Sequence, residues 1–290
     1  MLDCIVAHRG LHDIDDLLVR PLENTLRAFS ESWKLCPLAE CDIVASKDGE
    51  IFLCHDKTFA RLAKDFVSPL TNTDVCMLEA RQIDGIALKD GSNPCRLSEV
   101  LECARELHTK LVVEIKTDLN VDVLLESLKQ LLTSHPDLAE HVAVIMSFDL
   151  RVMQDLAKWK EKPLGVKMML LLNNQTMPNS DPVSLVKSNE LDGIYLQFHE
   201  TMLNPTTQHE LAAICQQVPT VGVWNASKTQ QEFDGLKTAE ELIRLGVQLV
   251  NSDLPQDELI FLGLAHYANI GNTKPTRDVS NWSCGDLCCW

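Results

Sequence analysis

Three carboxylates are spaced so that they could share one cation. Glu40 and Asp42 lie two residues apart in an apolar run, so their side chains point to one face of a strand. Glu114 occupies a second apolar run. Buried carboxylates repel one another, and a hard divalent cation such as Mg²⁺ or Ca²⁺, which takes oxygen ligands, resolves that repulsion. The alternative is a set of structural salt bridges to Arg9 and Lys116.

Two histidines close apolar runs near these acids. His8 follows the first run of the chain, and His55 ends a run that comes after Asp42. A pair of imidazoles can act as general base and general acid near neutral pH, although either alone is more often a core histidine. Arg9 can clamp a phosphate with two hydrogen bonds, and Lys116 offers a point charge. The pattern favours acid–base chemistry on an anion beside a metal ion.

Two further residues allow a functional and a structural interpretation. Glu23 stands at the start of a predicted helix, where it could orient a site or merely cap the helix. Trp224 ends an apolar run and could be a platform for a sugar or glycerol, or a plug of the barrel.

The elements that must position these residues alternate between strand and helix. Apolar runs of strand length are separated by amphipathic segments, which predicts a parallel sheet. Eight repeats favour a closed TIM (β/α)8 barrel, with a doubly wound open sheet as the alternative. We expect strands near Cys4–His8, Glu40–Ala45, Leu111–Lys116, Val142–Ser147, Gly165–Leu171, Gly193–Gln197, Thr220–Trp224 and Val247–Asn251. We expect helices around 23–35, 96–108, 121–134, 150–159, 181–188, 206–217, 228–245 and 256–268.

One connection is too long for a simple crossover. After the second strand, the turn Ser46–Glu50 predicts a hairpin that continues through Ile51–Cys54, and a polar region with several Gly and Pro residues follows. This predicts a small insertion at about 43–95 that covers the barrel mouth. We expect one catalytic domain over residues 1–270 and an irregular, Cys-containing tail at 271–290.

Composition limits the partners of the chain. The net charge of −16 opposes nonspecific binding to nucleic acid, and an anionic substrate would need a local patch of cations or a metal. Eleven scattered cysteines favour buried reduced thiols. No signal peptide and no apolar run long enough to cross a bilayer is found, so we expect a soluble cytoplasmic protein without an integral membrane segment. The sequence does not indicate the oligomeric state.

An ordered set of short motifs resembles the glycerophosphodiester phosphodiesterase family. The resemblance extends from residue 5 to residue 255, nearly the whole chain. Each motif is weak alone, but the set in this order is specific. The motifs are His8–Gly10, Glu23–Thr25, Glu40–Asp42, His55–Asp56, Arg96–Leu101, Val113–Lys116, Ser147–Asp149, Val223–Asn225 and Ser252–Pro255.

The resemblance implies a TIM-type barrel and a metal-dependent phosphoric diester hydrolase of lipid and glycerol metabolism. Its substrates would be glycerophosphodiesters such as glycerophosphocholine or glycerophosphoethanolamine, cleaved to sn-glycerol 3-phosphate and an alcohol. The resemblance suggests that the attacking oxygen could be the substrate's own glycerol 2-hydroxyl, which would give a cyclic phosphate that water then opens. By the same resemblance, Glu40, Asp42 and Glu114 would bind Mg²⁺ or Ca²⁺, His8 and His55 would exchange protons, Arg9 and Lys116 would hold the phosphate, Glu23 would orient the site and Trp224 would pack on the glycerol.

Two rival functions remain open. The nearer is phospholipase D-like hydrolysis of lysophospholipids on the same barrel, for which the insertion would supply an apolar slot for an acyl chain. The other is a non-catalytic barrel that only binds phosphodiesters. The loop from Gly10 to Glu23 is longer than is usual in the family and carries three aspartates, which leaves substrate choice open. The slot would be lined by Phe59, Phe66, Val67 and Leu70.

Overall fold

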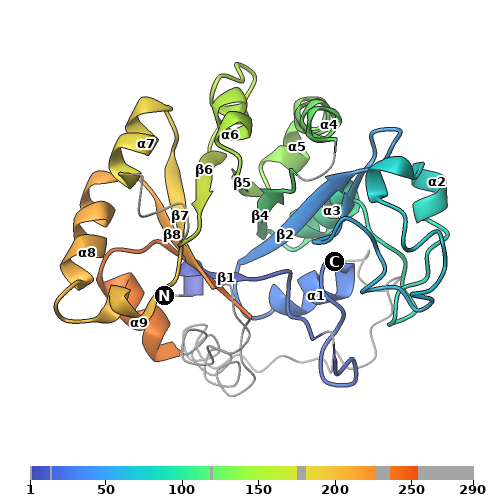
Figure 1. The fold of residues 1–290 in the computed structure, drawn as a ribbon, viewed down its shortest axis with the longest axis horizontal. Coiled ribbons are helices and arrows are strands. Elements are labelled where there is room, and N and C mark those ends of the chain that lie inside the picture. The colour runs from blue at the N-terminus through green and yellow to red at the C-terminus, as the bar shows by residue number, and fades with distance from the viewer. Residues whose placement is uncertain (1, 14, 118–119, 175–180, 226–235, 254–290) are drawn as a thin grey trace.

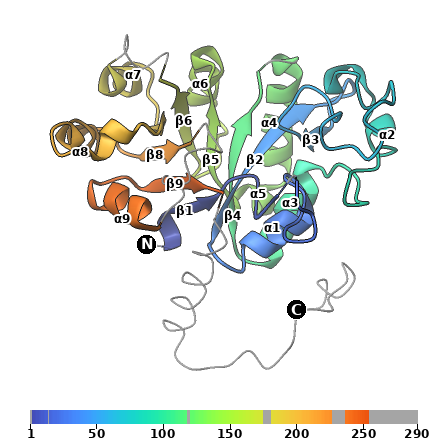
Figure 2. The same cartoon turned by 60° about the horizontal axis from the view of Figure 1, so that its bottom comes forward.

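Eight parallel strands close into a barrel with helices between them (Figures 1 and 2). The computed structural model describes residues 2–13, 15–117, 120–174, 181–225 and 236–253. The first strand pairs with both the second strand and the last, which closes the ring and makes the open-sheet alternative wrong. The predicted TIM barrel is confirmed.

The strands and the longer helices that the structure describes agree with the predicted segments to within a few residues, whereas the short helices Ala80–Ile83 and Pro136–Ala139 were not predicted. The strands are β1 (Ile5–Ala7), β2 (Leu38–Ala45), β3 (Ile51–Leu53), β4 (Lys110–Ile115), β5 (Val142–Ser147), β6 (Lys167–Leu172), β7 (Gly193–Gln197), β8 (Val221–Trp224) and β9 (Leu249–Ser252). The helices are α1 (Leu26–Ser32), α2 (Ala80–Ile83), α3 (Leu97–Glu106), α4 (Val121–Ser134), α5 (Pro136–Ala139), α6 (Leu150–Ala157), α7 (Pro182–Ser188), α8 (Gln208–Gln217) and α9 (Leu236–Arg244). Short 3₁₀ turns lie at Leu2–Cys4, Val75–Met77 and Glu200–Leu203.

Successive side chains along the barrel strands pack alternately into the barrel interior and into the layer between the strands and the helices. In β4, Val112 packs inside the barrel, whereas Val113 packs in the layer between the strands and the helices. The same alternation holds in β2, where Leu38 faces the barrel interior and Ala39 faces the helices. Because side chains two apart share a face, the acidic positions beyond Leu38 and Val112 must also point into the barrel. Strand periodicity alone therefore directs the acids to one place.

A buried tyrosine fills the barrel interior opposite these acids. The Tyr195 side chain is fully buried, and its neighbour across the β7–β8 pair is Gly222. A Cβ atom added at Gly222 would lie 2.4 Å from the Tyr195 ring. Glycine at this position is what allows the ring to lie across the interior, as the alternation of large and small residues in small barrels requires.

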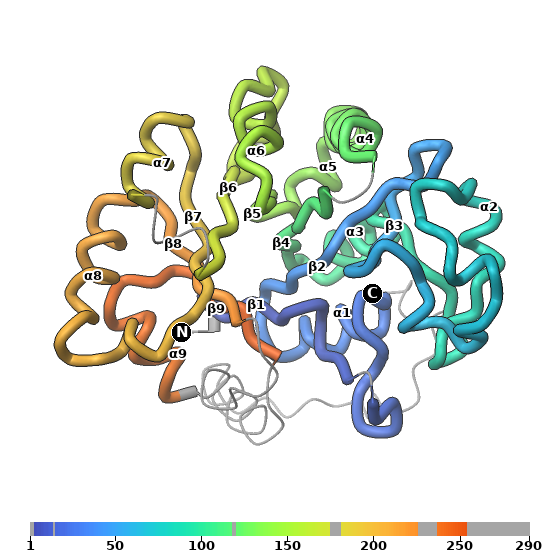
Figure 3. Tube along the Cα trace, viewed as in Figure 1, coloured from blue at the N-terminus to red at the C-terminus, as the bar shows by residue number. Residues whose placement is uncertain are grey.

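The predicted insertion follows β2 and forms its own small core. β3 runs antiparallel to β2 after the turn at Ser46–Glu50, where Gly49 has φ +89°. The remainder of the insertion holds α2 and lies beside α1 at one side of the barrel (Figures 1 and 3). Its buried apolar residues form a cluster separate from the two cores of the barrel, and Leu22 from the loop before α1 belongs to this cluster. The insertion is thus packed against the first βα connection.

Some predicted segments fall on residues that the structure does not describe. The expected helix at 228–245 is seen as α9 from residue 236 on, and its first residues, 228–235, lie outside the described part. The expected helix at 256–268 and the Cys-containing tail at 271–290 lie wholly outside it. Within the described residues, no helix combines the length and the apolar character needed to cross a membrane.

Candidate active site

The three predicted carboxylates lie together on the adjacent strands β2 and β4. Asp42 and Glu114 are register partners in adjacent strands, and Glu40 lies two residues before Asp42 on the same face. One oxygen from each of the three side chains lies within 4.8 Å of the others. All three residues are buried. Their convergence therefore follows directly from strand pairing.

The pKa values of two of these buried acids shift in opposite directions. Burial, together with the charge of Asp42, raises the pKa of Glu40 to about 8. Burial would also raise the pKa of Asp42, but the cations of Lys116 and Arg9 outweigh it and hold that pKa well below its usual range. One oxygen of Glu40, Oε1, is buried without a hydrogen-bond partner among the described residues, whereas Oε2 accepts from the Arg9 N–H at 3.0 Å.

Two cationic side chains, Arg9 and Lys116, form ion pairs with the cluster, as the salt-bridge alternative predicted. Lys116 Nζ lies 2.8 Å from Asp42 Oδ1 and 2.5 Å from Glu114 Oε1. Arg9 Nε lies 3.2 Å from Asp42 Oδ2. Neither contact reaches the partnerless oxygen of Glu40. A donor set of three carboxylates with such an oxygen fits a hard divalent cation as a further partner.

The turn after β1 is built to hold Arg9 over the cluster. Arg9 and Asn24 both have φ in the left-handed region, at +52° and +54°, and the Asn24 N–H donates to the Arg9 carbonyl at 3.1 Å. Gly10 follows with φ +76°, and a Cβ atom there would lie 2.7 Å from the backbone of Ala28 in α1. Non-glycine residues in this conformation are strained, and such strain is tolerated where packing fixes the chain.

The capping interpretation of Glu23 is wrong. The residue that caps α1 is Thr25, whose hydroxyl oxygen accepts a hydrogen bond from the Ala28 N–H. This leaves the two preceding residues for the site. Asn24 donates from Nδ2 to Asp42 Oδ2 at 2.9 Å.

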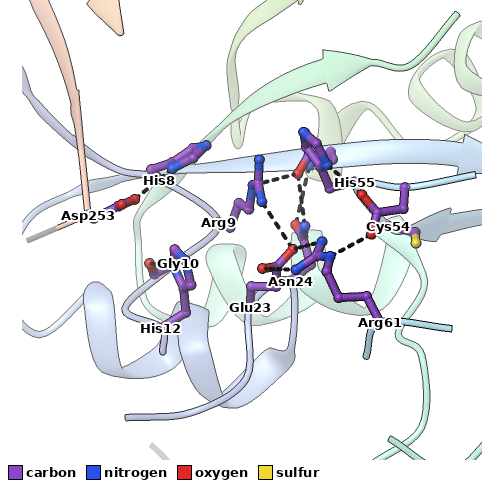
Figure 4. A network of polar contacts seen from close by, with 12 residues as sticks. His8, Arg9, Gly10, His12, Glu23, Asn24, Cys54, His55, Arg61 and Asp253 are labelled. Atoms are coloured by element: carbon purple, nitrogen blue, oxygen red, sulfur yellow. Dashed lines mark hydrogen bonds and ion pairs between the residues drawn. The ribbon is translucent and has the colours of Figure 1, made fainter. Parts of the chain in front are cut away.

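Glu23 instead joins two arginines. Its buried carboxylate accepts from Arg9 at 3.2 Å and from two nitrogens of Arg61 at 2.7 and 2.8 Å (Figure 4). Burial raises the pKa of Glu23, but the hydrogen bonds from Arg61 and the charge of Arg9 outweigh it, so the net shift is downward. Sequence reasoning missed Arg61, because it lies in the insertion with no strand pattern around it to show its direction.

The first histidine is held by an aspartate from the last strand connection. Asp253 Oδ1 lies 2.7 Å from His8 Nδ1 (Figure 4). His8 Nε2 lies 3.9 Å from Glu40 Oε2. Burial and Arg9 lower the pKa of His8, but the hydrogen bond and the charge of Asp253 outweigh them and the net shift is upward. Bonding at Nδ1 leaves Nε2 as the nitrogen that faces the acids.

The second histidine has a similar carboxylate partner. Asp56 Oδ1 lies 2.9 Å from His55 Nδ1, and Asp56 Oδ2 accepts from Arg61 Nε at 2.5 Å. The hydrogen bond from His55 and the contacts with Arg61 hold the pKa of Asp56 well below its usual range. A chain of ion pairs therefore runs from Arg9 through Glu23, Arg61 and Asp56 to the second imidazole.

Trp224 lies apart from the carboxylate cluster. Its indole Nε1 donates to the Leu172 carbonyl at 3.2 Å, and its ring meets Phe148 edge to face at 5.4 Å between centroids. The residue is half-buried at the end of β8, and Phe148 follows β5. The two aromatic rings thus lie at the same end of the barrel as the acids, while the structure records no contact between Trp224 and the cluster.

Two other expectations need correction or addition. Phe59 is buried in the core of the insertion, so it cannot line an open acyl slot, whereas Phe66 and Val67 are exposed. His12, which is not among the predicted site residues, is buried with its ring 6.0 Å from that of His8. Its Nδ1 lies 3.3 Å from the Gly10 carbonyl, which places it as packing behind the first histidine.

Known proteins match both the sequence and the fold. The model of the Glycerophosphoryl diester phosphodiesterase family matches residues 8–256. No curated protein sequence matches the chain. Solved structures that are similar include a protein from Galdieria sulphuraria (21% identity, covering 89% of this chain and 96% of that chain, TM-score 0.68). A glycerophosphodiester phosphodiesterase from Thermotoga maritima shows 19% identity over 90% of this chain and 97% of that chain, with TM-score 0.65.

A third similar structure carries a bound product. It is a phosphodiesterase from Oleispira antarctica in complex with sn-glycerol 3-phosphate, 17% identical over 89% of this chain and 96% of that chain, with TM-score 0.62. At these identities the solved structures establish the fold alone.

Proposed function

The chain belongs to the glycerophosphoryl diester phosphodiesterase family and is a phosphoric diester hydrolase, and we propose that it cleaves glycerophosphodiesters to sn-glycerol 3-phosphate and an alcohol. Glycerophosphocholine and glycerophosphoethanolamine are the substrates proposed. The observation that carries this proposal is the pair of carboxylate-bound histidines on either side of a buried acidic cluster and Arg9. We also propose residues 1–270 as a single catalytic domain.

The acidic cluster is the proposed cation site. Glu40, Asp42 and Glu114 would hold Mg²⁺ or Ca²⁺ through their carboxylate oxygens, and the partnerless buried oxygen of Glu40 supports this assignment. When bound, the cation supplies positive charge that stabilises the charge developing on the phosphate oxygens. Arg9 and Lys116 lie against the same carboxylates, so their charges are directed at the place where the phosphate would bind.

The two histidines are the proposed proton carriers. Each is bonded at Nδ1 to an aspartate, which fixes the ring and leaves Nε2 to exchange a proton with the substrate. One imidazole takes the proton of the attacking oxygen, and the other gives a proton to the departing alkoxide. The attacking oxygen is either the glycerol 2-hydroxyl of the substrate, with a cyclic phosphate opened by water in a second step, or water itself.

Glu23 and Trp224 have supporting roles in this proposal. Glu23 orients the Arg9 guanidinium by accepting its hydrogen bond, so that the arginine is fixed before an anion arrives. Trp224 offers a half-buried ring at the barrel mouth against which the glycerol carbons can pack. We place the activity in the cytoplasm, which is consistent with buried thiols such as Cys36 and Cys41 that form no disulfide.

The decisive experiment measures release of glycerol 3-phosphate from glycerophosphocholine with Mg²⁺, with Ca²⁺ and with a chelator. We expect turnover with one or both cations and loss of turnover with the chelator. The variants His8→Asn and His55→Asn should each lower kcat by about 10²–10⁴-fold. His209, exposed on α8 away from the site, gives a matched control in His209→Asn, which should retain full activity.

Two results would contradict the proposal. Near-normal kcat in both site variants would remove the histidines from the mechanism. Tight binding of glycerophosphocholine without any turnover would instead identify a barrel that only binds phosphodiesters.

A further inference from the structure

Two loops beside the site hold large apolar side chains out in the solvent. In the loop before α1, Leu18 is 99% exposed and Val19 is 51% exposed. In the insertion, Phe66 is 64% exposed and Val67 is 73% exposed. These four residues are called the apolar rim below. Single exposed apolar residues are ordinary, but adjacent pairs on two neighbouring loops are typical of interaction sites.

Hydrogen bonds within the first loop keep its pair exposed. The Asp13 carboxylate accepts from the N–H groups of Asp15 and Asp16 at 2.8 and 3.1 Å, and the Asp16 carboxylate accepts from Leu18 N–H at 3.1 Å. The Val19 N–H donates to the Asp16 carbonyl at 3.1 Å. The loop is therefore a compact turn that presents both apolar side chains at its tip.

The second loop is fastened in the same way. The Thr71 hydroxyl donates to the Asp65 carbonyl at 2.8 Å, and Asn72 Nδ2 donates to the Phe66 carbonyl at 2.6 Å. The Val67 N–H lies 3.3 Å from the Asp65 carboxylate that accepts it. Side chains and backbone of the turn bind each other, so the exposure of Phe66 and Val67 is a fixed feature of the loop.

The two loops form one border of the active site. Leu17 and Leu70, which flank the two exposed pairs, pack on the same apolar cluster of the insertion. The first loop ends at Glu23 and the second follows Arg61, and these two residues bind each other beside Arg9. Figures 1 and 2 both show the loop before α1 next to the insertion. Whatever covers the apolar rim therefore lies next to the proposed phosphodiester site.

Chemistry and charge together select the occupant. A molecule that reaches both the rim and the site must combine an apolar part with a phosphodiester, and phospholipids have this composition. The net charge of −16 opposes approach to an anionic surface at long range, so a surface of zwitterionic lipid is the favoured one. Loops that insert apolar side chains to a shallow depth bind such surfaces through buried apolar area.

We propose that Leu18, Val19, Phe66 and Val67 insert into a zwitterionic lipid surface and present the active site to lysophospholipids held in that surface. The substrate class rests on the proposed phosphodiesterase function, whereas the binding step does not. The lysophospholipid loses its choline or ethanolamine: a new bond forms between phosphorus and the attacking oxygen, the bond between phosphorus and the headgroup oxygen breaks, and the departing alkoxide takes up a proton to become the free alcohol. The glycerol 2-hydroxyl or water supplies the attacking oxygen, as in the soluble diesters.

The binding step is tested by sedimentation of the full-length protein with phosphatidylcholine vesicles. We expect the wild-type protein to pellet with the vesicles and Leu18→Ser/Val19→Ser/Phe66→Ser/Val67→Ser to lose at least tenfold in partitioning. Leu164 is 101% exposed in the turn before β6, at the opposite end of the strands from the site. Leu164→Ser is therefore the matched control and should pellet like the wild type.

Kinetics separate this inference from the proposed function. The fourfold variant should hydrolyse glycerophosphocholine at the wild-type rate, because none of its positions belongs to the catalytic machinery, but should lose at least tenfold in kcat/KM on micellar lysophosphatidylcholine. Failure of the wild-type protein to hydrolyse glycerophosphocholine would contradict the proposed function and leave the vesicle result to decide the lipid surface. Absence of lysophosphatidylcholine turnover by the wild-type protein would overturn the substrate class, and equal turnover by the variant would overturn the role of the rim in presenting this substrate.

Three results would overturn the lipid surface itself. They are absence of wild-type binding to phosphatidylcholine vesicles, equal binding by the fourfold variant, and binding that appears only when anionic lipid is added. A change of the variant's mass in size-exclusion chromatography, with vesicle binding unchanged, would assign the rim to contact with a second copy. If the fourfold variant does not fold, Phe66→Trp provides a second measurement: its added fluorescence must shift to the blue with vesicles, and an unchanged spectrum overturns the proposal.

Discussion

Replacing Arg61 by Met tests the chain of ion pairs that connects the insertion to the barrel. Arg61 donates two hydrogen bonds to the Glu23 carboxylate and one to Asp56, which in turn holds His55. Met retains much of the volume of the arginine side chain and removes its charge. The substitution therefore leaves the buried Glu23 with Arg9 as its remaining cationic partner, at 3.2 Å.

The expected cost follows from the burial of the two partners. Breaking a fully buried ion pair by removing one partner costs about 3–5 kcal/mol. Here the Glu23 side chain is 3% exposed, but Arg61 is 36% exposed and therefore partly screened by solvent. Because Arg9 still contacts Glu23, we expect a loss of about 2 kcal/mol in the free energy of unfolding. We also expect a roughly tenfold lower kcat, since Asp56 no longer fixes the second histidine.

The stability loss should depend on pH in one direction. Arg61 and Arg9 hold the pKa of Glu23 below its ordinary value of 4.5. A carboxyl group with a depressed pKa stabilises the fold above its ordinary value, and this contribution is lost as the pH falls through the folded-state value. The pKa of Asp56 is lowered as well and acts in the same sense. The difference between wild type and Arg61→Met should therefore be largest near neutral pH and shrink below pH 4.5.

Urea unfolding of the metal-free protein measures the loss, and a double-mutant cycle assigns it. Glu23→Gln, Arg61→Met and the double variant should give a coupling energy on the order of 1–3 kcal/mol. Arg151 is paired with Asp149, but the Arg151 side chain is 87% exposed. The matched control Arg151→Met should therefore change the free energy of unfolding by less than about 0.5 kcal/mol. Equal stability of Arg61→Met and wild type at pH 7, or additive effects in the cycle, would refute the reasoning.

Three further substitutions test other parts of the site. Asp253→Asn removes the carboxylate that holds His8, so kcat should fall by about 10²-fold with a smaller change in KM; wild-type kcat would contradict this role. Gly10→Ala should lower the free energy of unfolding by at least about 2 kcal/mol in urea melts. Gly91 also has a positive φ, +88°, but open space around it, so Gly91→Ala should cost only about 1 kcal/mol. Equal costs would count against a steric requirement at Gly10. Tyr195→Phe should leave stability unchanged or raise it by about 1 kcal/mol, because the hydroxyl has no hydrogen-bond partner among the described residues; a clear loss would show that the hydroxyl is bonded.

The sequence predicted the carboxylate cluster because strand periodicity determines where those side chains point. Glu40 and Asp42 share a face by their spacing, and Glu114 joins them as soon as β4 is placed next to β2. The position of His8 followed from the predicted end of the first strand alone, because His8 comes directly after β1. These predictions required the identity of neighbouring strands, and a barrel with sequential strands supplies it.

The residues that sequence reasoning missed depend on contacts that periodicity does not encode. Arg61 lies in an irregular segment, and its three bonds to Glu23 and Asp56 arise from the way the insertion packs on the loop before α1. Asp253 lies within the motif Ser252–Pro255, but its contact with His8 depends on the pairing of β9 with β1. The N-cap of α1 is Thr25, two residues after Glu23. The sequence does not determine the start of a helix to within two residues, so it could not decide whether Glu23 caps the helix or belongs to the site.

An anionic substrate poses an electrostatic problem for this site. The six carboxylates of this site outnumber Arg9, Arg61 and Lys116, the permanent cations that contact carboxylate oxygens in the described ion pairs, and burial already raises the pKa of Glu40 to about 8. A phosphodiester would add another negative charge, so the proposed chemistry requires positive charge beyond what the arginines and the lysine supply. A divalent cation held by Glu40, Asp42 and Glu114 would provide it, and this would reconcile a net charge of −16 with a phosphodiester substrate. The six carboxylates are those of Glu23, Glu40, Asp42, Asp56, Glu114 and Asp253.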